Sequence, residues 1–532
     1  MWLVVAIPGV LGFITGWYHV GVPPLWGDEG VTKAMAARSV SQLLATMPHD
    51  DVVHGAYYLV IHIVERTAGS SFADLRFPSV VAMAVAAAVT ALIARRLAAL
   101  AHAPLPDVTG AAAGVLFALL PGVIRYAQEA RSYAIVTMLA AISTYLLVSA
   151  MTDGGGVRRW TTYGVAAGLT GLFNIFGLFL LAAHAVTLVV ARLGRDTGAV
   201  PRARGRRVVG VPAGWLIAGA AAVIVLLPVI ALAYNQRGAL AWMSGPPSIP
   251  GAASSLARYW AGSQQLARLV FGLAAFGAVA GAVASAVTRG RGERILAVSP
   301  VSVALPWLVV PSAIVLVVSQ VHPLWDGRYM EYCTPALAIL AAWGITWLAR
   351  TLGVPLRRAR LAWLGWLPAA AAFALLVGML VPAGAKMRLP GSRPDNLQGD
   401  SRIVAANARP GDIVFFIPIS YRPIEVEFPA DWRDVRDIAE AESPVASDTL
   451  YGTDVSPAEL LKRFTHVTRV WVYCAPGNNQ YLASARATPV DLLEARLVSR
   501  MKLVHRWRDG DKMLILYGTG STAQTGSPAG SR

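Results

Sequence analysis

Long apolar stretches alternate with short polar segments along most of the chain, and this alternation predicts helices that cross a membrane. A spanning helix needs roughly 20 mostly apolar residues, and on that criterion the sequence contains eleven candidates. We therefore expect a polytopic α-helical membrane protein. The predicted spans cover residues 2–22, 77–98, 108–127, 132–151, 160–175, 177–193, 211–234, 266–288, 300–321, 332–349 and 361–381.

The charged residues in the gaps predict a topology. Basic clusters occupy every second gap, which places those gaps in the cytoplasm by the positive-inside rule. These clusters lie at residues 95–96, 158–159, 192–207, 289–294 and 350–360. Eleven spans that start inside put the C-terminus outside, so we expect a multi-pass protein of the cytoplasmic membrane whose remaining gaps carry polar chemistry on the outer face.

The fifth and sixth candidates share one apolar run, broken only near Asn174 and Gly177. If this run formed a single helix, every later basic loop would move to the opposite side of the membrane. The charge rule would then fail, so we divide the run into two spans.

Composition supports a membrane location and bears on partners. Of 532 residues, 55% are hydrophobic and 14% are charged, which is too apolar for an ordinary soluble protein. The net charge of +16 comes from arginines beside apolar spans, so it indicates topology and anionic headgroups rather than nucleic acid. Two cysteines, Cys333 and Cys474, exclude a disulfide framework. Residues 1–19 lack the features of a cleaved signal and predict a retained first span.

The composition changes at about Pro382, where mixed polar and charged sequence begins. Short apolar runs at 413–418, 470–473 and 513–517 predict strands, and helical spacing recurs at 460–464 and 489–500. We expect a transmembrane domain over 1–381, a small α/β domain outside the membrane over 382–517, and a disordered Gly/Ser/Thr-rich tail over 518–532. A long first outer loop, 25–76, carries helical patterns that fit short amphipathic helices on the membrane surface.

An acidic pair, Asp28 and Glu29, directly follows the first span. The structural interpretation makes Asp28 a helix N-cap and puts Glu29 in the first turn. The functional interpretation makes a carboxylate at the bilayer edge the general base for an acceptor hydroxyl. The pair alone does not decide between them.

Histidines, carboxylates and tyrosines gather in the segment 49–58. As a structural feature it is a polar loop leading into an interfacial helix, with Tyr57 and Tyr58 in the aromatic belt. Asp51 and His54 are the residues that could hold a divalent metal, although ligands from one loop form a weak metal signature.

The segment 126–133 forms the predicted outer turn between the third and fourth spans. As structural features, Glu129 and Arg131 either pair with each other, or the arginine snorkels to the lipid headgroups. Gln128 lies beside them. A functional arginine at this depth would face a phosphate.

A second polar segment, 322–329, ends the ninth span with His322, Asp326, Arg328 and Tyr329. An interfacial loop with aromatic anchors and an Asp-Gly turn accounts for most of it. Arg328 is the sharper candidate, because a guanidinium at headgroup depth binds a phosphate bidentately.

In this order, the polar motifs resemble those of a known family. The chain resembles the bacterial branch of the protein O-mannosyltransferase and lipid A aminoarabinose transferase family, within the GT-C class of membrane glycosyltransferases. The resemblance covers roughly the first two thirds of the chain. It rests on the acidic pair at 28–29, Tyr-Tyr at 57–58, Leu-Arg-Phe-Pro-Ser at 75–79, Tyr-Ala-Gln-Glu-Ala-Arg-Ser-Tyr at 126–133 and Gly-Arg-Tyr at 327–329.

The resemblance implies a mechanism. A polyprenyl-phosphate sugar would be the donor, with its lipid tail between helices, and one in-line attack would invert the anomeric centre. Asp28 would be the base, Glu29 would orient it or the acceptor, and Arg131 and Arg328 would contact the donor phosphate. The substrate contacts implied by the matching segments are His54, Tyr57, Tyr58, Gln128, Glu129, His322, Asp326 and Tyr329.

Sugar, metal and acceptor stay open at this level. The family's His-Pro-Pro-Leu-Tyr-Tyr pattern becomes His-Gly-Ala-Tyr-Tyr at 54–58, which leaves a metal role for Asp51 or His54 in doubt. Arginine outnumbers lysine, as in the GC-rich genomes of actinobacteria, whose envelopes use polyprenyl-phosphate mannose and arabinose. Mannose is the first expectation and arabinose the next. The acceptor is a glycan, a glycolipid or a protein.

A lipid-linked sugar flippase or transporter is the main alternative. It would use arginines to pass a phosphate, but would keep its polar groups near the midplane of broken helices. Here the ionisable residues cluster at the ends of spans, which favours an enzyme. An inactive scaffold for envelope assembly is a third alternative, which only activity assays separate.

Overall fold

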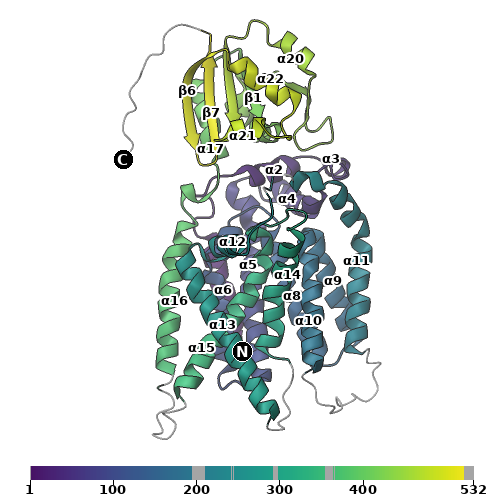
Figure 1. Ribbon diagram of the computed structural model, residues 1–532, viewed down its shortest axis with the longest axis vertical. Coiled ribbons are helices and arrows are strands. Elements are labelled where there is room, and N and C mark those ends of the chain that lie inside the picture. Colours follow the sequence, from purple (N-terminus) through teal and green to yellow (C-terminus); the bar gives the residue numbers. More distant parts are fainter. Residues whose placement is uncertain are drawn as a thin grey trace. The chain divides into compact units, whose positions relative to one another are not determined.

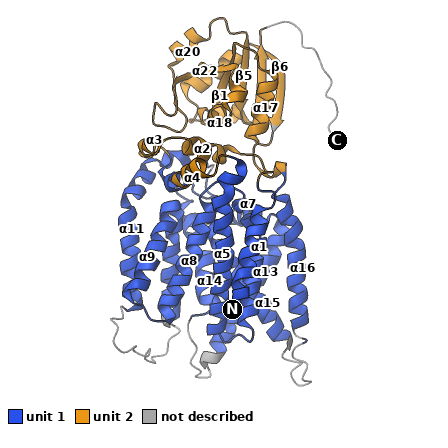
Figure 2. Cartoon of the chain, turned by 180° about the vertical axis from the view of Figure 1, so that it is seen from behind, with its two compact units in different colours: residues 1–20, 51–57, 71–389 blue, residues 21–50, 58–70, 390–532 orange. Residues whose placement is uncertain are grey.

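The computed structural model describes residues 2–193, 210–240, 242–243, 245–290, 298–353, 364 and 366–519. Most of the basic clusters predicted at 192–207, 289–294 and 350–360, and nearly all of the predicted tail, lie outside these residues. The chain divides into two compact units (Figure 2). Unit 1 comprises 1–20, 51–57 and 71–389, and unit 2 comprises 21–50, 58–70 and 390–532. The first outer segment thus contributes to both.

Unit 1 is a bundle of apolar helices whose axes are roughly aligned with one another (Figure 1). Each of the eleven predicted spans overlaps at least one of them, and the span predicted at 108–127 overlaps two. The helices are α1 (Trp2–Trp17), α5 (Phe72–Leu100), α6 (Pro106–Leu119), α7 (Pro121–Ala127), α8 (Tyr133–Thr152), α9 (Val157–Phe173), α10 (Phe179–Leu193), α11 (Val211–Asn235), α13 (Gln264–Gly290), α14 (Pro300–Val318), α15 (Thr334–Gly353) and α16 (Trp366–Lys386).

By length and hydropathy, seven helices within the described ranges could each cross a membrane, and α6 with α7 would make an eighth. The α6–α7 pair is bent by 61° at its break. Apolar helices at Trp2–Trp17 and Ile175–Ala191 are shorter. A polytopic helical protein is therefore confirmed, while the number of eleven spans stays a prediction.

The long apolar run after residue 160 breaks where the sequence predicts. Helix α9 ends before Asn174, whose side chain accepts a hydrogen bond of 3.0 Å from the Phe176 N–H. A 3₁₀ turn, η2 (Ile175–Leu178), then leads into α10. Because the asparagine offers the backbone a local partner, it competes with continued helix.

Close packing in unit 1 depends on small residues. A Cβ added at Gly344 in α15 would lie 2.1 Å from the Leu273 carbonyl oxygen of α13. At that point the two backbones are in direct contact, which is the usual solution where apolar burial in lipid supplies little attraction between helices.

Unit 1 also contains four shorter elements. They are η1 (Val52–His54), η3 (Arg237–Leu240), α12 (Ile249–Ala261) and η4 (Gly327–Cys333).

Unit 2 contains a five-stranded sheet in the order β2-β1-β5-β7-β6. Strand β1 pairs parallel with β2 and β5, while β7 pairs antiparallel with β5 and β6. The predicted strands are confirmed as β1, β5 and β7. The strands are β1 (Asp412–Ile417), β2 (Val435–Asp437), β5 (Arg469–Cys474), β6 (Lys502–Asp509) and β7 (Lys512–Gly518), with β3 (Glu440–Glu442) and β4 (Thr453–Asp454) in a separate pair.

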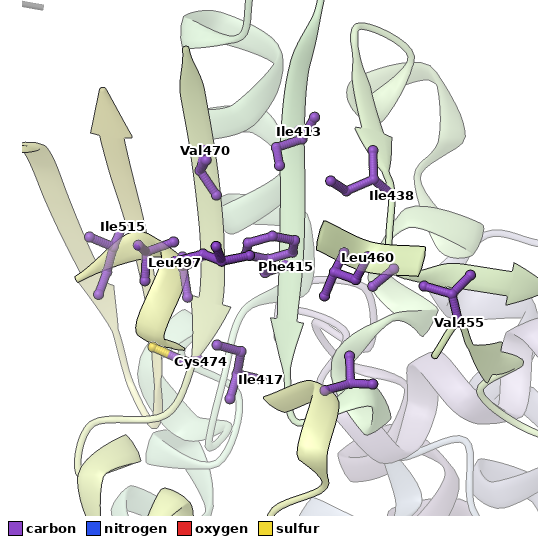
Figure 3. Close-up of a cluster of buried hydrophobic side chains, with 14 residues drawn as sticks. Ile413, Phe415, Ile417, Ile438, Val455, Leu460, Val470, Cys474, Leu497 and Ile515 are labelled. Atoms are coloured by element: carbon purple, nitrogen blue, oxygen red, sulfur yellow. The ribbon is translucent and has the colours of Figure 1, made fainter. Parts of the chain in front are cut away.

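Each face of this sheet has its own apolar core, because side chains alternate along a strand. Ile413, Phe415 and Ile417 of β1 face Leu460 and Leu497 (Figure 3). The helices on this face are α20 (Pro457–Arg463) and α22 (Pro489–Val498), with α21 (Asn478–Leu482) beside them. The opposite face is covered by α17 (Leu397–Asn407), α18 (Pro423–Glu427) and α19 (Pro429–Trp432). The expected α/β domain is confirmed.

Helices from the first outer segment complete unit 2. They are α2 (Gly27–Ala36), α3 (Val40–Thr46) and most of α4 (Gly55–Thr67). Met35, Leu43 and Tyr58 form a buried cluster with Leu450. The predicted helical patterns are therefore real, and part of their apolar surface packs against the C-terminal residues.

Candidate functional site

Three cationic or ionisable side chains converge in unit 1. Arg131 lies between α7 and α8, Arg328 lies in η4, and His54 ends η1. His54 and Arg131 are each only 7% exposed. Burial lowers the pKa of His54 well below its usual range, and the positive charges of Arg131 and Arg328 lower it further. The imidazole is therefore neutral at physiological pH and lies within electrostatic reach of both guanidinium groups.

Arg328 is oriented by its neighbours in η4. The Asp326 carboxylate accepts a hydrogen bond from the Arg328 N–H at 3.0 Å, and its other oxygen lies 3.2 Å from Arg328 Nε. The guanidinium also lies over the Trp242 ring, 5.3 Å from its centroid. The carboxylate and the aromatic face together restrain the orientation of the Arg328 guanidinium.

The turn that carries Arg131 is held by buried hydrogen bonds. Gln128 Nε2 donates to the carbonyl oxygens of Gly16 and Tyr18, at 2.9 and 2.7 Å. Ser79 Oγ donates to the Glu129 carbonyl oxygen at 2.8 Å and lies 3.2 Å from the Tyr57 hydroxyl. Four predicted site residues therefore support this turn or belong to it.

Aromatic contacts join the Arg131 turn to η4. The Tyr133 and Tyr329 ring centroids are 6.4 Å apart, and Tyr329 stacks on Phe176 at 4.9 Å. Ser132 Oγ is 3.3 Å from His54 Nδ1. The segments 126–133 and 322–329, which carry the two arginines, are far apart in the sequence. In the structure they form one polar cluster.

Sequence reasoning missed three members of this cluster. Arg125 lies 3.6 Å from the Glu129 carboxylate, and both act electrostatically on Glu331. Tyr259 of α12 interacts with Asp326, Arg328 and Arg125. Glu331 carried a usable signal, because an ionisable residue at the start of an apolar span is a functional candidate by default. Tyr259 carried none.

The acidic pair belongs to unit 2, in the first turn of α2. Trp26 takes the N-cap position without a side-chain cap, so the interpretation of Asp28 as N-cap is wrong. Glu29 is fully buried and Asp28 is half-buried. Both carboxylates are favoured there by the positive end of the helix dipole.

The remaining predicted residues have mixed surroundings. Tyr57 and Tyr58 are both fully buried, so the aromatic-belt interpretation is wrong, and Tyr58 belongs to the Met35–Leu43–Leu450 cluster. His322 is exposed beyond the end of α14. The Asp51 carbonyl oxygen accepts from the His54 N–H at 3.0 Å.

Within the parts of the chain that the structure describes, no group of three or more His, Cys, Asp or Glu side chains has the geometry of a metal site.

An apolar groove runs between α9 and α11 with a volume of about 560 Å³. Its floor is made of small residues, Gly164, Gly168, Ala218 and Ala222, and leucine and valine side chains form its walls. The lining is thus almost wholly apolar, like the hydrocarbon part of a lipid.

Searches with the sequence find no matching family model and no matching curated protein. Solved structures do match. The apo ArnT from Cupriavidus metallidurans aligns over 97% of both chains at 14% identity with a TM-score of 0.50. The apo oligosaccharyltransferase from Archaeoglobus fulgidus aligns over 97% of this chain and 74% of its own at 13% identity, with a TM-score of 0.52.

A further structure of the archaeal oligosaccharyltransferase AglB, in complex with an inhibitory peptide and a dolichol-phosphate, aligns over 99% of this chain and 74% of its own. It is 12% identical, with a TM-score of 0.51. Both neighbours are GT-C glycosyltransferases. The GT-C fold expected from the sequence motifs is therefore confirmed for nearly the whole chain.

Proposed function

We propose that this protein is a membrane glycosyltransferase that moves a sugar from a polyprenyl-phosphate donor to an acceptor hydroxyl. The observation that carries the proposal is the convergence of Arg131 and Arg328 on a neutral His54 in a chain with the GT-C fold. Arg131 and Arg328 bring two positive charges into this cluster, and a guanidinium group binds phosphate oxygens bidentately. The dolichol-phosphate bound by the archaeal neighbour supports a lipid phosphate as that anion.

The proposed reaction is a single displacement. The acceptor oxygen attacks the anomeric carbon, and its proton passes to the Asp28 carboxylate, which Glu29 helps to orient. The bond from the anomeric carbon to the phosphate oxygen breaks, and polyprenyl phosphate leaves with the electron pair. Arg131 and Arg328 stabilise the charge that develops on the phosphate. One displacement inverts the configuration at the anomeric carbon.

The remaining predicted contacts enter this scheme in two groups. We assign His54, Asp326 and Tyr329 to the neighbourhood of the donor head group, because they surround the arginines. Gln128, Glu129 and Tyr57 act by supporting the Arg131 turn. Tyr58 and His322 stay predicted substrate contacts. The groove between α9 and α11 suits the lipid tail. A divalent metal is left to experiment.

The biological setting follows from the sequence expectations. Mannose is the first choice of sugar and arabinose the next, with a glycan, glycolipid or protein of the cell envelope as acceptor. The protein spans the cytoplasmic membrane, with its N-terminus on the cytoplasmic side. The transmembrane catalytic domain covers 1–381, and the α/β domain over 382–517 lies on the outer side.

The proposal is tested by transfer of label from radioactive polyprenyl-phosphate mannose or arabinose to a membrane glycan extract, with purified full-length protein. We expect transfer by the wild type, none by Asp28→Asn, and donor binding by both. Asp74→Asn is the matched control, since Asp74 is an acid in the first turn of another helix, α5. Transfer by Asp28→Asn at the wild-type rate would remove the assigned base. Tight donor binding without transfer by any protein would favour the transporter.

A further inference from the structure

The backbone just before the acidic pair is held by a residue from far along the chain. The Gly27 N–H, one residue before Asp28, donates a hydrogen bond of 2.9 Å to Asp395 Oδ1. This N–H is one of the groups at a helix start that receive no partner inside the helix. Trp26, at the N-cap position, supplies no side-chain cap. The Asp395 carboxylate therefore accepts the hydrogen bond that the side chain of a neighbouring N-cap residue normally accepts.

Asp395 is itself held by the turn between β6 and β7 and by the first residue of β7. Lys512 Nζ lies 3.0 Å from Asp395 Oδ2, and the Asp511 N–H donates to the Pro394 carbonyl oxygen at 2.7 Å. Gly510 has a φ of +55°, and a Cβ there would lie 2.1 Å from the same Pro394 oxygen. Only glycine permits this approach. The turn thus holds both the backbone and the side chain of the 394–395 segment.

The negative charges in this arrangement are partly compensated by one lysine. Asp395 is 4% exposed, and its carboxylate lies near that of Asp28, which repels it. Lys512 supplies the compensating positive charge and lies over the Tyr421 ring at 4.4 Å. Without Lys512, two carboxylates would face each other at the start of α2, which costs free energy for both when they are ionised.

Further contacts hold the same helix to the C-terminal residues. The Leu397 N–H donates to the Leu25 carbonyl oxygen at 3.1 Å, before α2. Lys33, in the last turn of α2, lies 3.3 Å from the Glu427 carboxylate and donates to the Glu427 carbonyl oxygen at 3.2 Å. Both ends of α2 are therefore tied to residues beyond 390, and the N-terminal tie is the one next to Asp28.

We propose that Asp395, with Lys512 as its counter-charge, is a positioning residue that fixes the first turn of α2 and so the direction of the Asp28 carboxylate. This inference rests on the proposed function, in which Asp28 is the base. It gives the C-terminal domain a role in catalysis without contact with substrate. A base displaced by about 1 Å loses on the order of 100-fold in rate.

The test compares four variants of the full-length protein: Asp395→Ala, Asp395→Asn, Lys512→Met and Asp412→Ala. Asp395→Asn keeps an oxygen that can accept from the Gly27 N–H, so it separates that hydrogen bond from the charge. Asp412 is the matched control, because it is also a buried aspartate with a basic partner, Arg469 at 2.9 Å. It begins β1 and accepts a hydrogen bond from Trp471, so its contacts are within the sheet and not with α2. The readouts are kcat, KM for donor and acceptor, and amide hydrogen exchange over residues 25–36.

We expect Asp395→Ala to lower kcat about 10- to 100-fold with the donor KM unchanged, and to speed exchange in the first turn of α2. Asp395→Asn should recover most of kcat, and Lys512→Met should fall between. Asp412→Ala should lower the unfolding temperature while kcat and exchange in α2 stay near wild type.

Three results would overturn the inference. Wild-type kcat or wild-type exchange in Asp395→Ala would remove the positioning role while leaving the proposed function intact. An equal loss of kcat in Asp412→Ala would make the effect one of domain stability. No transfer by the wild type would reject the base itself, and with it the catalytic meaning of the tie, even if exchange in α2 still responds to Asp395.

Discussion

A single guanidinium on an aromatic ring is a precise recognition element when its orientation is fixed. Arg328 meets this condition, since Asp326 and Trp242 each restrain it. A lysine could keep the charge at this position, but not the planar fork that binds two oxygens at once.

We therefore predict that Arg328→Ala weakens donor binding by about 1.5–3 kcal/mol, the usual range for a lost charged hydrogen bond. Arg328→Lys should recover only part of this, and acceptor affinity should not change. The measurement is calorimetric titration with the polyprenyl-phosphate sugar. Arg237→Ala is the control, because Arg237 also lies over a ring, that of Tyr234, but is exposed. Equal donor affinity in Arg328→Ala and wild type would move the phosphate elsewhere.

At the same scale, sequence finds charges more readily than it finds surroundings. Arg131 and Arg328 could be predicted because each lies beside apolar spans, where charged residues are rare and are usually functional. Tyr57 and Tyr58 were assigned to the aromatic belt, yet both are buried inside the protein. A helical pattern does not say whether lipid or protein covers a given face.

Among the elements, helix α2 contributes a lysine to a buried ion pair. Its Lys33 pairs with Glu427 of α18, and burial raises the pKa of Glu427 to about 8 even though Lys33 opposes this shift. Glu65 of α4 also faces Glu427 and raises its pKa further. Because the folded-state pKa exceeds the ordinary value of 4.5, Glu427 favours folding when it is protonated. That contribution is complete below about pH 4.5 and is lost as the pH rises through about 8.

We predict that the unfolding temperature of the wild type falls between about pH 5 and about pH 9, and that Glu427→Gln falls less over the same range. Glutamine keeps the shape of the side chain and cannot ionise. Other buried carboxyl groups are common to both proteins, so the difference between the two pH profiles reports Glu427 alone. Parallel profiles would show that Lys33 fully compensates the ionised carboxylate.

Elements were predicted where length alone decides, and less well where a single residue reshapes a span. The candidate at 108–127 was expected as one helix, but α6 and α7 meet at an angle of 61°. The cause is Pro121, which lacks an N–H and clashes with the preceding turn. This bend moves the turn that carries Arg131 off the axis of α6, so a local proline sets where a charged side chain points.

For the molecule as a whole, chain topology is the property that the sequence predicts and that a direct experiment decides. A reporter fused after Gly391, past the end of α16, should be active only outside the cytoplasm. A reporter fused after Gly155, beside the basic pair at 158–159, should be active only inside. Activity of both fusions on the same side of the membrane would contradict the eleven-span topology.

The division into two units was beyond sequence reasoning for a physical reason. Residues 21–50 belong to the same unit as residues 390–532, but no local sequence pattern indicates contacts between segments so far apart. The hydrogen bond between Gly27 and Asp395 spans 368 positions. Periodicity reports which face of an element is apolar, but not which distant element covers it.

The order of synthesis gives this separation a practical meaning. Translation runs from the N-terminus, so the acidic turn of α2 is made long before Lys512 of β7. Contacts this distant form late, because the intervening chain must exist before its ends can meet. A nascent chain that has not yet reached β7 would therefore have α2 without the Asp395–Lys512 contact at its first turn. On the assignment of Asp28 proposed above, such a chain would lack a fixed base until β7 has formed.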